Sequence, residues 1–252
     1  MNRIGIWGPL AVLAMVFIGG FIGYVWLPRV QYAGQGFFAA WCSALGVPRS
    51  WAASGETPRT ETAASEVILT QDLPRSIRGA DSGHGATLAL RCTMCHGPRG
   101  ISYAGAPNLS GQFATVVYKE LRDYASSARP NTLMSAMARS LSDTQMREVA
   151  AYYASLPRPA RGEPAAAPPP IVKWGAPMRN IPPCGSCHGG MDHTLASPWL
   201  AGEPATYIHT ELAKFASDER HNDINAQMRA VARNMSGEEM AQAAAYYAGD
   251  AR

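Results

Sequence analysis

The chain carries the same order of segments twice, and this internal repeat constrains its fold more than any other feature. The segment "ATVVYKELRDYAS" at 114–126 returns as "ATYIHTELAKFAS" at 205–217. Later in each copy, "LSDTQMREVAAYYAS" at 141–155 returns as "MSGEEMAQAAAYYAG" at 235–249. Because a repeated sequence indicates a repeated structural unit, we predict two homologous domains in tandem.

The pattern inside each copy is helical. In the first copy Glu120, Leu121 and Tyr124 recur at the spacing of one helix face. Ser142 and Ser236 stand where an N-cap would begin the last helix of each copy. No stretch of the repeats alternates apolar and polar residues as a half-buried strand does. We therefore predict an all-α fold for both copies.

Each copy contains a Cys-x-x-Cys-His motif near its start, formed by Cys92, Cys95 and His96 in the first and by Cys184, Cys187 and His188 in the second. Side chains three residues apart on a helix lie on one face. Both cysteines of a motif can therefore reach one flat group, with the adjacent histidine directed at its centre. A haem fits this arrangement, since it takes two thioether bonds from cysteines and an axial imidazole on its iron. The two motifs predict two covalently bound haem c groups.

Three other interpretations of the cysteines are weaker. A zinc site could use four thiolates, but zinc does not require a histidine directly after each pair. A thioredoxin-like redox pair is expected in a βαβ setting, which the sequence lacks. A disulfide framework is disfavoured by five cysteines in 252 residues.

A second ligand for each iron should come from later in each copy. Met134 and Met228 both lie seven residues before the equivalent positions that open the last repeated segment, whereas Met137 has Val231 as its counterpart. One other matched pair lies inside the last helices, where methionine usually packs in the core: Met146 and Met240. We predict Met134 and Met228 as the axial ligands.

The N-terminus contains 24 residues without a charge, Ile4 to Leu27, between Arg3 and Arg29. A helix of roughly 20 apolar residues can span a bilayer, whereas the apolar part of a cleaved signal peptide, the alternative, is shorter. We predict a single-pass anchor in a bacterial inner membrane, with the N-terminus cytoplasmic and the haem domains periplasmic.

The predicted organisation has five parts. These are an anchor at 1–30, an interfacial segment and tether at 31–80, a first domain at 81–158, a Pro/Ala-rich linker at 159–182 and a second domain at 183–252. A formal net charge of +3 without a run of basic residues excludes nucleic acid as a partner.

The chain resembles the two-haem class I cytochromes c, and the cytochrome c4 family most. The resemblance covers about 83–248 and rests on "CTMCHG" and "CGSCHG", on "PNLSGQ" and "PWLAGE", on "MSAMARSLSD" and "MRAVARNMSG", and on the Tyr-Tyr endings. It implies two small helical domains, each with a haem held by His and Met. The ligands would be His96 and Met134 in the first domain, and His188 and Met228 in the second. One departure is "APPPIVKWGAPMRNIPPC" at 167–184, which does not suit the helix that usually opens such a domain.

This resemblance implies an electron carrier rather than an enzyme, because His and Met together fill both axial positions of each iron. We expect two kinds of partner, the membrane and protein redox partners in a respiratory chain. The protein partners would be a quinol-oxidising complex, a dehydrogenase or a terminal oxidase. One alternative is a cytochrome subunit of a larger dehydrogenase, oxidase or quinol-oxidising complex. Another is a two-haem peroxidase, which the matched methionines disfavour.

Overall fold

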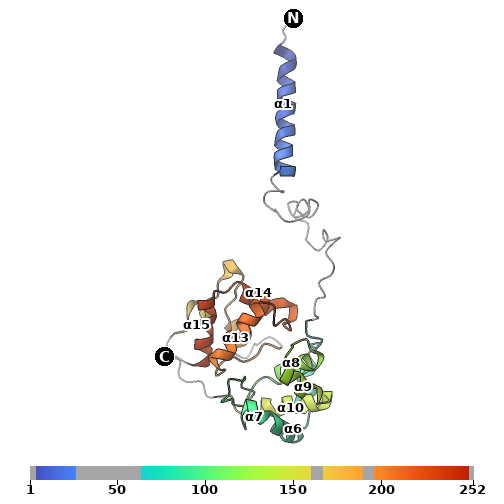
Figure 1. Cartoon of the computed structure of the whole chain (residues 1–252), viewed down its shortest axis with the longest axis vertical. Coiled ribbons are helices and arrows are strands. Elements are labelled where there is room, and N and C mark those ends of the chain that lie inside the picture. The colour runs from blue at the N-terminus through green and yellow to red at the C-terminus, as the bar shows by residue number, and fades with distance from the viewer. Residues whose placement is uncertain (1–3, 27–63, 160–166, 190–195, 250–252) are drawn as a thin grey trace. The chain divides into compact units, whose positions relative to one another are not determined.

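The computed structural model describes residues 4–26, 64–159, 167–189 and 196–249 (Figure 1). The chain divides into two compact units, Met1–Glu61 and Thr62–Arg252. Within the described residues all regular secondary structure is helical, apart from an isolated β-bridge between Ala176 and Ile181. The prediction of helical copies is therefore confirmed.

The predicted transmembrane helix is wrong. The helix α1 spans Ile4–Phe21, contains Pro9 and gives way to a π-helix, η1, at Ile22–Trp26. At about 1.5 Å per residue its 18 residues reach about 27 Å, less than the roughly 30 Å of a hydrocarbon core. Among the described residues no helix is both long and apolar enough to cross a membrane. This finding corrects the transmembrane anchor at 1–30 and the single-pass inner-membrane location with a cytoplasmic N-terminus, and it gives no support to the membrane as a partner. It does not test whether the haem domains are periplasmic.

The predicted interfacial segment and tether span 31–80. Residues 31–63 of this segment, which include the fifth cysteine, Cys42, lie outside the described residues. Its described end contains α5, Leu73–Arg78, which packs against the first copy. Leu73 and Ile77 are buried in the core of that copy.

The first copy is a cluster of short helices around one apolar core (Figure 1). Its elements are α6 (Ser82–Ala89), η2 (Leu90–Cys92), α7 (Thr93–His96), α8 (Ala114–Ser126), α9 (Thr132–Arg139) and α10 (Asp143–Ser155). The helix α10 packs against both α6 and α8, and α8 packs against α9. Ser142 caps α10 by accepting from the Gln145 N–H, and Gln145 returns a bond to the Ser142 backbone, so the predicted cap is confirmed as a capping box.

The second copy repeats this arrangement over its later part. Its elements are α11 (Pro170–Lys173), η3 (Pro177–Arg179), α12 (Gly185–His188), α13 (Ala205–Ala216), η4 (Ile224–Ala226), α14 (Gln227–Arg233) and α15 (Gly237–Ala248). Ser236 and Glu239 form the same capping box at the start of α15, as predicted. The helix α13 packs against both α14 and α15.

The two copies differ where the chain enters them. The first has α6, whereas the second has a hairpin-like loop closed by the Ala176–Ile181 bridge, with N–H to O distances of 2.7 and 3.2 Å. Residues of the predicted linker, Ile171, Val172 and Ile181, are buried in the core of the second copy. This loop takes the place of the opening helix, as the proline-rich sequence before Cys184 suggested. The domain limits themselves stay predictions.

Both copies lie in one compact unit and share a cluster of charged and polar side chains. This interface cluster consists of Lys119, Glu120, Asp123 and Arg129 from the first copy and of Glu211, Arg220 and Asn222 from the second. Arg129 Nη2 donates to Glu211 at 2.7 Å, and Lys119 Nζ donates to the Asn222 carbonyl at 2.8 Å. Burial raises the pKa of Glu120, but three neighbouring cations outweigh it and hold that pKa below its usual range. The charges of the cluster are thus largely compensated.

Candidate functional site

The first Cys-x-x-Cys-His motif forms two consecutive short helices. The segment η2 ends at Cys92, and α7 continues to His96. Gly97 ends α7 with a φ of 77°, where a Cβ would collide with the Ile101 carbonyl, so glycine is required at this position. Cys92 is half-buried, Cys95 is exposed and both are free thiols, while His96 is buried.

The imidazole of His96 is held in one tautomer by the backbone. Its Nδ1 lies 2.8 Å from the Pro107 carbonyl, which accepts only, so Nδ1 carries the proton. Burial lowers the pKa of His96, which favours the neutral ring. Nε2 therefore has a free lone pair, as a metal ligand requires.

The second motif repeats this arrangement at its histidine. The helix α12 contains Cys187 and His188 and begins directly after Cys184. His188 Nδ1 lies 2.9 Å from the Pro198 carbonyl, and burial again lowers the pKa of the imidazole. Pro107 and Pro198 are equivalent positions of the repeat, so both copies orient their histidine in the same way.

A tyrosine near the end of the last helix contacts the first cysteine of each motif. Tyr153 of α10 hydrogen-bonds to the Cys92 thiol, and Tyr247 of α15 hydrogen-bonds to the Cys184 thiol. Burial raises the pKa of both thiols. The sequence alone predicts no role for Tyr153 or Tyr247 beside the cysteines, although both belong to the repeated Tyr-Tyr pairs.

The predicted methionine ligands lie on equivalent helices. Met134 lies in the first turn of α9, where its N–H donates to the Asn131 side chain at 2.9 Å. Met228 lies at the start of α14 and packs against the second core. Both side chains are half-buried. The other matched pair, Met146 and Met240, is buried in the two cores, 4% and 7% exposed.

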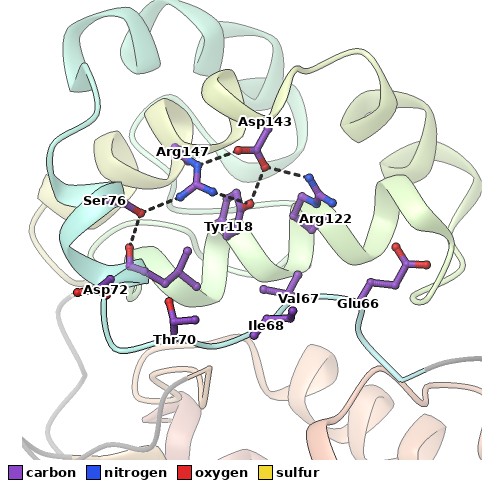
Figure 2. Close-up of a pocket in the computed structure, with 11 residues that line it drawn as sticks. Glu66, Val67, Ile68, Thr70, Asp72, Ser76, Tyr118, Arg122, Asp143 and Arg147 are labelled. Atoms are coloured by element: carbon purple, nitrogen blue, oxygen red, sulfur yellow. Dashed lines mark hydrogen bonds and ion pairs between the residues drawn. The ribbon is translucent and has the colours of Figure 1, made fainter.

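A separate pocket of about 450 Å³ lies on the first copy between α5, α8 and α10. Figure 2 shows three side chains converging on Asp143, which accepts from Tyr118 Oη at 2.6 Å, from Arg122 Nη1 at 2.9 Å and from Arg147 Nε at 2.8 Å. None of the predicted cysteine, histidine or methionine residues lines this pocket. The pocket is therefore separate from the predicted haem residues.

The residues around the motifs fit a haem in three respects. Each copy offers two thiols three residues apart, a neutral histidine with a free Nε2, and a half-buried methionine thioether. Beside Cys92 and Met134 in the sequence, Leu90 and Leu133 are 68% and 59% exposed, which leaves apolar surface for an apolar ring. Among the described residues, no group of three or more histidine, cysteine or acidic side chains could hold a metal ion by itself.

Comparisons with known proteins point to one family. The family model described as cytochrome c matches residues 82–157. The thiosulfate dehydrogenase electron acceptor of Stutzerimonas stutzeri (strain A1501) is 39% identical over 170 residues, which cover 64% of this chain and 79% of that protein. Cytochrome c4 of Thiocapsa roseopersicina is 36% identical over 166 residues, which cover 63% of this chain and 86% of that protein.

A solved structure has the same fold. Reduced recombinant cytochrome c4 from Pseudomonas stutzeri aligns with a TM-score of 0.63 at 27% identity, covering 68% of this chain and 99% of that one. The similarity therefore extends over both helical copies.

Proposed function

Because the chain belongs to the cytochrome c4 family, we propose that each of its copies attaches one haem c and that the chain carries electrons between protein redox partners. The first haem is assigned to Cys92, Cys95, His96 and Met134, and the second to Cys184, Cys187, His188 and Met228. When bound, each haem supplies an iron that takes up and releases one electron.

The observation that carries this proposal is the matched pair of histidine contacts. His96 and His188 each donate from Nδ1 to a proline carbonyl, at 2.8 and 2.9 Å, which leaves Nε2 as a ligand in both copies. The hydrogen bond from Nδ1–H to the proline carbonyl fixes the orientation of the imidazole and raises its basicity. Met134 and Met228 would each supply a soft sulfur ligand, which favours ferrous iron and raises the reduction potential.

We propose that a dehydrogenase donates electrons to this protein, and that the two act in a respiratory chain. One relative is named as the electron acceptor of a thiosulfate dehydrogenase, and it is 39% identical to this chain. An alternative is a stable cytochrome subunit of a larger dehydrogenase, oxidase or quinol-oxidising complex. Peroxidase activity is disfavoured, because a methionine ligand in each copy would leave neither iron an open position.

The test is made in two steps on the purified holo-protein. The mass of the denatured chain should exceed the protein mass by two haems, and the variant Cys184→Ser/Cys187→Ser should retain one. The wild-type protein is then mixed with a thiosulfate dehydrogenase and thiosulfate, and the absorption of reduced haem should rise without added mediator. A single haem, or no reduction while dithionite reduces both haems, contradicts the proposal.

A further inference from the structure

Two equivalent loops connect the predicted iron ligands to the rest of the molecule. The first histidine loop is 107–112 and the second is 198–203. Each begins with the proline whose carbonyl accepts from the histidine that is predicted as the iron ligand. Each is also tied to the last helix of its own copy, since Gly111 N–H donates to the Tyr153 carbonyl at 2.9 Å and Gly202 N–H donates to the Tyr247 carbonyl at 2.8 Å.

The first histidine loop reaches the second through Gln112. Its Oε1 accepts from the Trp199 N–H at 2.8 Å, and its Nε2 donates to the Trp199 carbonyl at 3.1 Å. Gln112 is 7% exposed. A single buried amide therefore satisfies both backbone groups of the residue that follows Pro198.

The second histidine loop reaches back through the equivalent residue, Glu203. Its Oε2 accepts from the Asn108 N–H at 2.8 Å, and Asn108 Nδ2 donates to the Gly202 carbonyl at 2.7 Å. Glu203 is 6% exposed, almost the same as Gln112. The two loops thus exchange contacts across an approximate two-fold relation, with a glutamine on one side and a glutamate on the other.

The charge of Glu203 is not compensated by an ion pair among the described residues. Arg158, beside the loops, donates to the Gly111 carbonyl at 3.2 Å and stacks 4.0 Å over the Trp199 ring. On α13, which follows Glu203, Tyr207 accepts from Arg129 and His209 is exposed. Burial raises the pKa of Glu203 to about 8, and the Asn108 N–H offsets this only in part.

The side chains of Gln112 and Glu203 differ in the hydrogen-bond donors that they carry. An ionised carboxylate only accepts, whereas a protonated carboxyl has one O–H donor and so resembles the amide of Gln112. A buried carboxylate without a cation is costly, and protonation removes that cost.

We propose that Gln112 and Glu203 are a matched pair of positioning residues: Gln112 holds the loop of His188, and Glu203 holds the loop of His96. Each residue therefore acts on the haem of the opposite copy. This inference rests on the proposed roles of His96 and His188 as iron ligands. We call the pair the loop clamp.

The test compares wild-type holo-protein with Glu203→Gln and Gln112→Glu, by measuring the potentials of both haems, assigned by NMR, from about pH 6 to about pH 10. In the wild type the potential of the first haem should fall as Glu203 ionises, because a new buried negative charge stabilises ferric iron. Glu203→Gln should remove this step, and Gln112→Glu should add one to the second haem. Haem propionates also titrate, so the difference between the proteins is the readout.

Stability supplies a second readout with a defined sign. Because the folded pKa of Glu203 lies above the unfolded value of 4.5, its contribution to stability is lost as the pH rises toward about 8. The wild type should therefore lose stability relative to Glu203→Gln over this range. Glu203→Ala, which lacks both donor and acceptor, should be less stable than Glu203→Gln at every pH.

Each protein is first checked for two haems by mass and for His/Met ligation by its absorption spectrum. Failure of the wild type in this check overturns the proposed function and the loop clamp with it. If the wild type passes, equal pH profiles for wild type and Glu203→Gln overturn the loop clamp alone. A Glu203→Gln protein as unstable as Glu203→Ala does the same.

Discussion

Met134 and Met137 lie three residues apart on α9, and both side chains are half-buried. Their local environments do not distinguish them as ligands. The repeat does, because Met228 stands at the position of Met134 and Val231 stands at that of Met137. At the scale of the residue, the assignment of the axial sulfur depends on comparing the two copies.

We predict that Met134→Ala and Met228→Ala each lower the potential of one haem and open that iron to carbon monoxide. The reason is the loss of a soft sulfur ligand that favours ferrous iron. Potentiometry and carbon monoxide difference spectra provide the measurement. Met137→Ala is the matched control and should bind no carbon monoxide. Carbon monoxide binding by Met137→Ala, with Met134→Ala inert, would reverse the assignment.

At the scale of the element, the copies differ most in the loop that precedes Cys184. Gly175 has a φ of 67° in this loop, and a Cβ there would collide with the Ile181 carbonyl and with Pro182. The Cys184 N–H donates to the Val172 carbonyl at 3.3 Å, so the same loop positions the second motif. A segment that the sequence suggests is a linker thus forms part of a core.

We predict that Gly175→Ala destabilises the holo-protein by more than Gly105→Ala. Both glycines have positive φ, at 67° and 74°, but a Cβ at Gly105 meets nothing within 4 Å. Gly105→Ala should therefore cost only the left-handed strain, about 1–2 kcal/mol, and Gly175→Ala should add the collision. Denaturant unfolding followed by circular dichroism measures both. Equal losses would show that the loop yields without cost.

At the scale of the whole molecule, the interface cluster joins the two copies by charge. Arg129 is 7% exposed and pairs with Glu120 of its own copy and with Glu211 of the other. Its guanidinium also lies 4.9 Å from the ring centre of Tyr124. The net worth of such a pair over an apolar contact is small, but losing one partner leaves the other charge buried.

We predict that Arg129→Ala lowers the free energy of unfolding by about 3–5 kcal/mol. Arg139→Ala is the control, because Arg139 is exposed and its bonds to Ala125 and Ser127 stay within one copy; it should change stability by about 0.5 kcal/mol or less. A double-mutant cycle of Arg129→Ala with Glu211→Gln should show strong coupling. Additive effects in that cycle would show that Arg129 and Glu211 are not coupled.

The sequence by itself determined the features that depend on local spacing. These features are the repeat, the helices, the caps Ser142 and Ser236 and the two Cys-x-x-Cys-His motifs. Each can be read from residues a few positions apart or from a comparison of the two copies. Helix periodicity and capping are short-range effects, so they can be predicted without knowing the fold. The same local criterion overestimated the N-terminal helix, because apolarity does not determine where a regular α-helix ends.

The tertiary structure alone decided which groups meet across the chain. The carbonyls that orient His96 and His188 come from loops ten or eleven residues away, and the partners of Gln112 and Glu203 come from the other copy. The equivalence of Gln112 and Glu203 was visible in the sequence, but their burial was not. Only the packing of two copies against each other removes solvent from a glutamate, and solvent exclusion is what changes its charge.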